Sequence, residues 1–225
     1  MNPHDNLILQ ELNESIFQCL LPRLQLVSLE KGDILYEKGA GQQGAYFPVN
    51  AVLSLQTEMS DGFVSDVALI GNRSMTVAGV CCSGVSNDRA IVRVSGLAYR
   101  MGVQDFVASV RHDASTLMQL LGLSKQRLMQ MSKSIACARH HSTDERVARY
   151  LLDLMDITDS SEINLTHQEL ADGIGVRRES VSLALKELEH KYVLLLDRGS
   201  VGVLDRSALM ECACECYEEL ETFAV

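Results

Sequence analysis

The stretch that decides the fold of this 225-residue chain is LTHQELADGIGVRRESVSLALKELE, residues 165–189. Thr166 and Glu169 have the Ser/Thr-x-x-Glu spacing of a capping box, so a short first helix is predicted to begin at Thr166. Gly173 and Gly175 are expected to end that helix in a tight turn. A second helix is predicted from Arg177 to about residue 190. Two helices joined by a short turn that contains glycine form a helix-turn-helix. The buried stripe of the second helix is predicted to be Val181, Leu185 and Leu188.

The start of the second helix carries side chains that suit DNA bases. In a helix-turn-helix, this end of the recognition helix meets base edges in the major groove. Arg can bind guanine through O6 and N7, Glu can accept from cytosine N4, and Ser can reach a base or a phosphate. Residues 193–204 form two apolar runs around Arg198-Gly199-Ser200, which predicts a hairpin wing whose tip can touch the DNA backbone. The predicted DNA-binding residues are Thr166, Gln168, Arg177, Arg178, Glu179, Ser180, Lys186 and Arg198, with Thr166, Gln168 and Lys186 assigned to phosphates.

A solvated two-helix hairpin is the alternative interpretation, because charged residues at the start of a helix usually face only water. The formal net charge of −10 also opposes binding to phosphate. Net charge averages over the whole chain, however, and a DNA-binding face needs only local positive potential. The capping box, the glycine turn, the arginine-rich helix start and the wing occur in order along the chain, and this order favours DNA binding.

A long helix is predicted upstream, from Asp113 to about Ala138, where there is no Pro and only one Gly. Its apolar residues fall on a spacing of three and four, with Ser124 at the one polar position of the stripe. We expect a symmetric dimer along this stripe, since two-fold dimers are the commonest oligomers. The alternative is a helix that packs only within its own chain. The predicted dimer interface residues are Leu117, Leu121, Leu128, Met131 and Ile135.

A further helix is expected from Thr143 to about Met155, between the long helix and the helix-turn-helix. Thr143 is a reasonable N-cap, although Arg146 stands where a capping box would have Glu. Residues 157–162 are interpreted as a polar loop.

Residues 24–101 are predicted to be β structure, because short apolar stretches recur between turn signals. Lys31-Gly32-Asp33 marks one turn, and Asp61-Gly62 is a strong signal for a hairpin. Eight or so short strands at this spacing suggest a jelly-roll-like barrel. The predicted fold class is therefore α+β, with an N-terminal β-roll, a long dimerisation helix and a C-terminal winged helix-turn-helix.

This order of elements resembles the Crp/Fnr family of transcription regulators. The resemblance is most specific over residues 166–171, Gly175 and residues 178–181. It implies a β-roll sensor of the cyclic-nucleotide-binding-domain type at 1–112, a dimerisation helix at 113–138 and a DNA-binding domain at 139–225. It also implies a homodimer on a near-palindromic site in double-stranded DNA, with RNA polymerase as a further partner. Where the family often has a second Arg, this chain has Leu183, so its sequence preference is expected to differ.

The family resemblance raises the question of which effector the β-roll binds. Cyclic-nucleotide-binding members carry a Gly-Glu pair and then an Arg-Ser/Thr-Ala stretch that cradles the phosphate. The corresponding residues here, 71–82 and 87–90, contain no Gly-Glu pair, so cyclic nucleotide binding is not expected. Arg73 and Arg89 could each meet an anion and are the candidate effector-binding residues. The alternative for Arg89 is a surface residue that begins a strand.

The seven cysteines do not follow a familiar metal-binding pattern. Iron–sulfur members of the family use clustered cysteines near the N-terminus, and only Cys19 lies there, so a cluster is not expected. On a helix, Cys212 and Cys216 would share a face with Cys214 between them, and they could bind a metal with a third residue or oxidise. Neither the spacing nor a nearby His matches a known zinc motif, so no metal site is predicted.

Composition narrows the remaining functional classes. The hydrophobic fraction of 47% and the charged fraction of 22% are those of an ordinary folded protein. The apolar runs are too short to span a membrane, and the N-terminus does not have the pattern of a signal peptide, so we expect a cytoplasmic protein. Motifs of hydrolases, nucleotide-binding enzymes and zinc proteases are absent, so an enzyme is not expected. The alternative function is an effector-binding sensor or adaptor of the same fold that has lost specific DNA binding.

Overall fold

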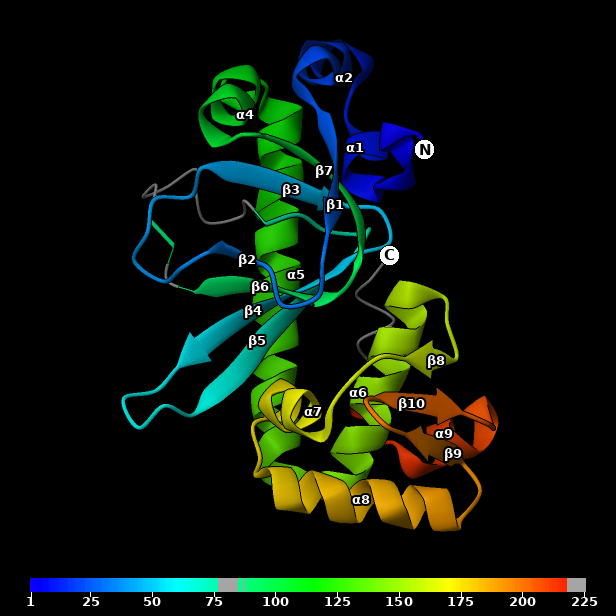
Figure 1. The fold of residues 1–225 in the computed structure, drawn as a ribbon. Helices are drawn as coiled ribbons and strands as arrows, with labels where there is room; N and C mark the ends of the chain where they lie inside the picture. Colours follow the sequence, from blue (N-terminus) through cyan, green and yellow to red (C-terminus); the bar gives the residue numbers. More distant parts are fainter. Residues whose placement is uncertain (77–84, 87, 218–225) are drawn as a thin grey trace. The chain divides into compact units, whose positions relative to one another are not determined.

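The computed structural model describes residues 1–76, 85–86 and 88–217, and the chain divides into two compact units. The first unit comprises residues 1–57 and 68–128, and the second comprises residues 58–67 and 129–225. Figure 1 shows the elements in chain order. Residues 77–82, half of the segment 71–82 that corresponds to the nucleotide-binding stretch of the family, lie outside the described residues.

Short helices open the first unit, and asparagine side chains begin three of them. These helices are η1 (Pro3–Asp5), α1 (Leu7–Glu11), α2 (Glu14–Leu20) and η2 (Leu21–Arg23). The side chain of Asn6 accepts hydrogen bonds from the amides of Ile8 and Leu9, which leaves its own amide group free to donate. That amide donates to the carbonyl oxygens of Pro48 at 2.8 Å and Ser74 at 3.1 Å. One buried side chain therefore both caps α1 and attaches it to the β structure.

Two antiparallel sheets form the N-terminal β structure. One sheet has the order β1 (Gln25–Leu29), β7 (Gly96–Gly102), β3 (Gly44–Pro48). The other has the order β2 (Ile34–Tyr36), β6 (Arg89–Val94), β4 (Val52–Glu58), β5 (Val64–Ile70). Residues 58–67, at the end of β4 and the start of β5, are counted with the second unit. The predicted turns at residues 31–33 and 61–62 are present, with Gly32 and Gly62 at positive φ. The predicted N-terminal β domain is confirmed.

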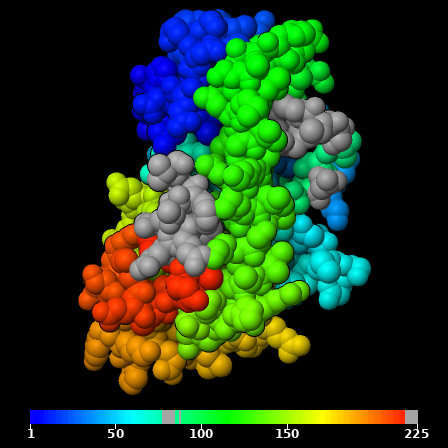
Figure 2. Space-filling model, turned by 180° about the vertical axis from the view of Figure 1, so that it is seen from behind, coloured from blue at the N-terminus to red at the C-terminus, as the bar shows by residue number. Residues whose placement is uncertain are grey.

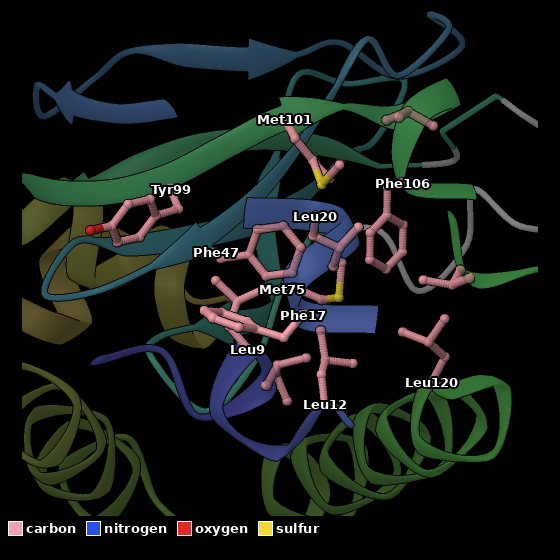
Figure 3. Packing of buried hydrophobic residues seen from close by; sticks show 14 residues of the cluster. Leu9, Leu12, Phe17, Leu20, Phe47, Met75, Tyr99, Met101, Phe106 and Leu120 are labelled. Carbon is pink, nitrogen blue, oxygen red and sulfur yellow. The ribbon is translucent and has the colours of Figure 1, made fainter. Parts of the chain in front are cut away.

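The core of the first unit lies between the strands and the helices (Figure 3). Phe47 of β3 and Phe106 of α4 (Val103–Val110) meet edge to face, with ring centroids 5.8 Å apart. Such aromatic pairs stabilise a fold beyond the effect of their buried area. Leu20 and Met75 extend the cluster, and Leu120 brings the long helix to it. The long helix is therefore packed against the β domain through one of its faces.

The long helix α5 (Ala114–His140) confirms the prediction for residues 113–138 within two residues at each end. Asp113 begins it, because its carboxylate accepts hydrogen bonds from the Thr116 amide at 2.8 Å and the Thr116 hydroxyl at 2.7 Å. Atoms of α5 are on the surface in Figure 2. Among the helices of the described residues, none is long and apolar enough to cross a membrane.

The second unit contains the predicted helix-turn-helix and wing. Helix α6 (Thr143–Thr158) is followed by α7 (His167–Ile174) and α8 (Arg178–His190). A three-stranded sheet of order β8 (Glu162–Ile163), β10 (Ser200–Val203), β9 (Leu194–Asp197) and the helix α9 (Arg206–Cys212) complete it. The wing strands β9 and β10 pair from Asp197–Ser200 to Leu194–Val203. This registry places Arg198 and Gly199 at the tip of the hairpin.

Several local predictions for this unit are wrong. Ser142, not Thr143, is the N-cap of α6, and Glu145 completes a capping box with it. The predicted loop at residues 157–162 is shorter in the structure, because α6 continues to Thr158 and Glu162 pairs with β10 as part of strand β8, which satisfies its backbone. Helix α9 ends at Cys212, and Ala213 is extended, so Cys212 and Cys216 do not share a helical face.

Candidate nucleic-acid interface

The two helices of the motif are positioned by the cap and the turn that the sequence predicts. Thr166 and Glu169 form a reciprocal capping box, in which the Thr166 amide donates to Glu169 Oε2 at 2.7 Å and the Glu169 amide donates to Thr166 Oγ1 at 3.2 Å. Gly175 follows α7 with φ +66° and ψ +48°, a left-handed conformation that favours glycine. The Val176 amide then donates to the Ala171 carbonyl at 3.0 Å. The turn thereby directs the chain into α8.

Gly173 has a different role from the one that the sequence predicts. It lies inside α7, and a Cβ atom added there would be 2.4 Å from Cζ of Tyr150 on α6. Real Cβ atoms do not approach other atoms so closely, so the absence of a side chain lets α7 and α6 pack against each other. Gly175 alone makes the turn.

Helix α8 buries one face and exposes the other. Val181, Leu185 and Leu188 are buried, as predicted. The first turn presents Arg178 and Glu179 to solvent, with Arg177 directly before it. Leu183, at the position where the family often has Arg, is 67% exposed. An exposed leucine on a face that carries charged side chains is available for contact with a partner, such as the methyl group of thymine.

The other predicted DNA-binding residues also lie in the second unit and on its surface. Gln168 is exposed, and its side-chain amide donates to Asp172 at 2.8 Å. Lys186 is exposed on α8, and Arg198 is exposed at the tip of the wing. Ser180 is half-buried. The predicted residues that are exposed are Thr166, Gln168, Arg177, Arg178, Glu179, Lys186 and Arg198.

The charge of this surface is more favourable to DNA than the net charge of the chain. Residues 165–198 carry five Lys or Arg and six Asp or Glu, against −10 for the whole protein. Three of those acids are engaged inside the motif. Glu169 is held by the cap and Asp172 by Gln168, while Glu189 accepts from the Leu196 amide at 3.3 Å. These hydrogen bonds fix the positions of three carboxylates within the motif but leave their charge, so the segment is close to neutral and its basic side chains act locally.

His167 is a positioning residue that the sequence reasoning missed. Its Nδ1 lies 2.8 Å from the hydroxyl of Ser182, and that hydroxyl is 3.0 Å from the Arg178 carbonyl oxygen. The contact joins the first turn of α7 to the first turns of α8. Burial lowers the pKa of His167, and the nearby charges of Arg178 and Lys186 lower it further. The neutral imidazole thus holds together the two helices that the motif must present at a fixed angle.

The predicted effector-binding arginines lie in the first unit. Arg73 is exposed, and Arg89 is half-buried with its Nε 4.0 Å from Glu37 Oε2. Their role stays a prediction. A third arginine, Arg127 of α5, was not predicted, and it donates to the Met75 carbonyl at 3.0 Å. The helical spacing could have predicted its position, because Arg127 follows Leu120 and Leu123 on the face of α5 that packs against the β domain.

Arg127 belongs to a buried polar group of the first unit. Burial lowers its pKa, while Tyr36 and Asp88 raise it. Burial also raises the pKa of Tyr36 to about 12, with Asp88 adding to the rise. A buried guanidinium needs polar partners, because an unpaired charge in a protein interior is costly. Tyr36 and Asp88 supply such polar surroundings beside Arg127.

The fold and this surface define the class of the protein: a β domain and a long helix, followed by a winged helix-turn-helix. Residues 145–212 match the family model described as a Crp-like helix-turn-helix domain. A "CRP-like cAMP-activated global transcriptional regulator" of Mycobacterium tuberculosis is 24% identical over 213 residues, which are 90% of this chain and 94% of that protein.

Solved structures agree in fold. FixK2 from Bradyrhizobium japonicum has a TM-score of 0.72 at 16% identity, over 85% of this chain and 98% of that one. The c-di-GMP responsive global regulator CLP from Xanthomonas campestris has a TM-score of 0.69 at 16% identity, over 86% of this chain and all of that one. Residues 145–212 are therefore a Crp-like helix-turn-helix domain, and the chain as a whole is similar to Crp/Fnr regulators in its sequence and its fold.

Proposed function

We propose that this protein is a sequence-specific DNA-binding transcription regulator that acts as a homodimer in the cytoplasm and receives its signal through the β domain. The observation that carries the proposal is the first turn of α8. Arg178 and Glu179 are exposed there, Arg177 is exposed directly before them, and the opposite face of the helix is buried in the second unit. A rigid helix that offers arginine and glutamate at its N-terminal end suits direct readout in the major groove.

The long helix supports a dimer. Four of the five predicted interface residues expose apolar side chains: Leu117 by 39%, Leu121 by 61%, Leu128 by 66% and Ile135 by 56%. Exposed leucines at helical spacing are unfavourable in water, and a second copy of α5 would cover them. A two-fold dimer would place two reading helices on inverted half-sites.

Site selection tests the proposal. Purified protein is incubated with a random duplex library, and the bound DNA is recovered and sequenced over several rounds. We expect a consensus of two inverted half-sites whose centres are about 34–36 Å apart, or a multiple of one helical turn. Enrichment of no sequence over the starting library would leave the adaptor of the same fold, which has lost specific binding, as the better reading.

Variants of α8 test which residues read the bases. Each base contact is worth about 1–3 kcal/mol and a dimer loses two, so Arg178→Ala and Glu179→Ala should each weaken binding to the selected site by about 2–6 kcal/mol, roughly 30-fold or more, and relax the preference at one base position of each half-site. Lys191→Ala and Glu187→Ala are matched controls, because they remove the same charges elsewhere on or beside α8. Equal losses in the variants and the controls would show that only overall charge matters.

The names of two relatives indicate which class of effector to test. The mycobacterial relative is described as cAMP-activated and the Xanthomonas relative as c-di-GMP responsive, so relatives of this fold respond to different nucleotides. We propose that the signal of this protein is not cyclic AMP, since the Gly-Glu pair is absent. Saturable thermal stabilisation by cyclic AMP, which Arg89→Ala removes, would overturn this.

A further inference from the structure

Three cysteines that are distant in sequence meet inside the second unit. Cys137 lies near the end of α5, and Cys214 and Cys216 follow α9. Their side chains are buried, with exposed fractions of 1%, 4% and 5%. The three Sγ atoms lie within 4.8 Å of one another, and those of Cys137 and Cys214 are 3.5 Å apart. The group joins segments 77 residues apart.

These distances match those of sulfur ligands around one metal ion. Zinc–sulfur bonds are about 2.3 Å long, which separates the sulfurs by roughly 3.8 Å in a tetrahedral site and roughly 4.0 Å in a trigonal one. The observed separations of 3.5 Å and up to 4.8 Å bracket these values. Small side-chain rotations would bring the three sulfurs to one ion without a change of backbone.

The surroundings also suit a group of thiolates. Arg149 of α6 is buried, donates to Asp153 at 2.6 Å and lies beside Cys137. Arg146 also lies close enough to Cys137 and Cys214 for its charge to interact with theirs. Asp153 offsets part of the charge of Arg149, and the remaining positive charge of the two guanidinium groups offsets the negative charge that three thiolates around one cation would leave.

We propose that Cys137, Cys214 and Cys216 together bind one thiophilic metal ion, Zn(II) or Cu(I). Soft thiolate ligands select these ions. On binding, each thiol gives its proton to the solvent and its sulfur donates an electron pair to the metal, whose oxidation state does not change. Three thiolates suffice for Cu(I), whereas Zn(II) takes four ligands. The candidate for the fourth zinc ligand is His141. Its Nε2 is 3.5 Å from Oε1 of Glu215, the residue between Cys214 and Cys216. The proposal does not rest on DNA binding.

Metal titration of the reduced full-length protein, in the absence of oxygen, tests the site. Zn(II) is added in competition with a chromophoric zinc chelator, and Cu(I) in competition with bathocuproine disulfonate. We expect one ion per chain and a rise in thermal stability on binding. Cys137→Ser, Cys214→Ser and Cys216→Ser should each weaken binding by about 100-fold or more, whereas Cys212→Ser should not. His141→Ala should weaken zinc binding and leave copper binding unchanged.

Alkylation of the unchanged protein covers the case in which a serine variant does not fold. The protein is alkylated with and without metal over hours, because the buried thiols react only when the structure opens transiently, and modified peptides are identified by mass spectrometry. Metal should protect Cys137, Cys214 and Cys216, while exposed Cys19 reacts equally in both samples. The proposal is overturned if neither ion outcompetes its chelator, or if Cys212→Ser loses as much affinity as the others. A Cys137–Cys214 disulfide in protein purified in air, together with no metal binding after reduction, also overturns it.

Discussion

Gly173 shows how one missing side chain sets the packing of two helices. Its position inside α7 places Cζ of Tyr150 2.4 Å from any added Cβ, and the Tyr150 hydroxyl oxygen at 2.6 Å. The ring of Tyr150 is buried, so a shift of α6 away from α7 would disturb the packing of the core. The residue therefore determines the distance between α6 and α7, on which the orientation of the motif depends.

Replacing Gly173 with Ala should therefore destabilise the second unit. We expect a loss of about 1–3 kcal/mol, because the new methyl group overlaps the ring of Tyr150. Denaturant unfolding followed by circular dichroism measures it. Gly122→Ala is the matched control, since Gly122 lies in α5 with no atom within 4 Å of an added Cβ. That substitution should stabilise the chain by about 0.5–1 kcal/mol. Equal effects of both substitutions would contradict the packing role.

His167 is expected to make the free energy of unfolding depend on pH. Burial and two nearby cations lower its pKa below 6.5, so the folded state binds this proton less readily than the unfolded state. Stability is then complete above pH 6.5 and falls as the pH drops through the lowered value. We expect the wild type to lose more unfolding free energy between about pH 7.5 and 5 than His167→Gln, whose amide does not titrate. Parallel pH profiles would show that His167 makes no such contribution.

At the scale of elements, sequence patterns predicted the features that depend on neighbouring residues, namely helix caps, turns and buried helix faces. The α7 capping box, the left-handed Gly175 and the buried stripe of α8 depend on residues within one or two turns, and all three are present. The cap of α6 was misplaced by one residue, because Thr143 and Ser142 are both good caps and only Glu145 decides between them. Local patterns therefore predicted most of the elements, with errors at their ends.

Contacts between distant elements could not be predicted in this way. Cys137 and Cys214 meet only because α5, α6 and the segment after α9 pack together, and no spacing in the sequence records this. Strand β8 has two residues and depends on β10 for its hydrogen bonds. Arg127 was not predicted as a buried residue, although its spacing from Leu120 places it on the face of α5 that packs against the β domain.

The exposed stripe of α5 gives a prediction at this scale. Leu121→Arg with Ile135→Arg should convert a dimer to a monomer, because two buried guanidinium groups would face their copies across the two-fold axis. Sedimentation velocity measures the change. Met118→Arg is the control, since Met118 is 66% exposed but is not one of the predicted interface residues. A wild type that sediments as a monomer, or a dimer unchanged by the double substitution, would show that α5 does not form the dimer.

For the whole molecule, the net charge of −10 and the proposed partner have to be reconciled. A chain this acidic is repelled by DNA at long range, so binding depends on short-range contacts that release condensed counterions. Arg198 at the wing tip and Lys186 on α8 are exposed basic side chains outside the first turn of the reading helix. They are suited to phosphates, whereas Arg178 is suited to bases, and the two roles differ in their dependence on salt.

Salt titration of wild type and Arg198→Ala distinguishes these roles. Each phosphate contact contributes about 0.9 to the slope of the logarithm of the binding constant against the logarithm of salt concentration, so a dimer that loses two contacts should have a slope about 1.8 smaller. Affinity should fall to a similar degree on selected and on random DNA, because a phosphate contact carries no sequence information. Lys191→Ala, which removes an exposed charge at the far end of α8, should leave the slope unchanged. An unchanged slope in Arg198→Ala would remove the wing from the interface, while a loss confined to the selected site would make Arg198 a base-reading residue.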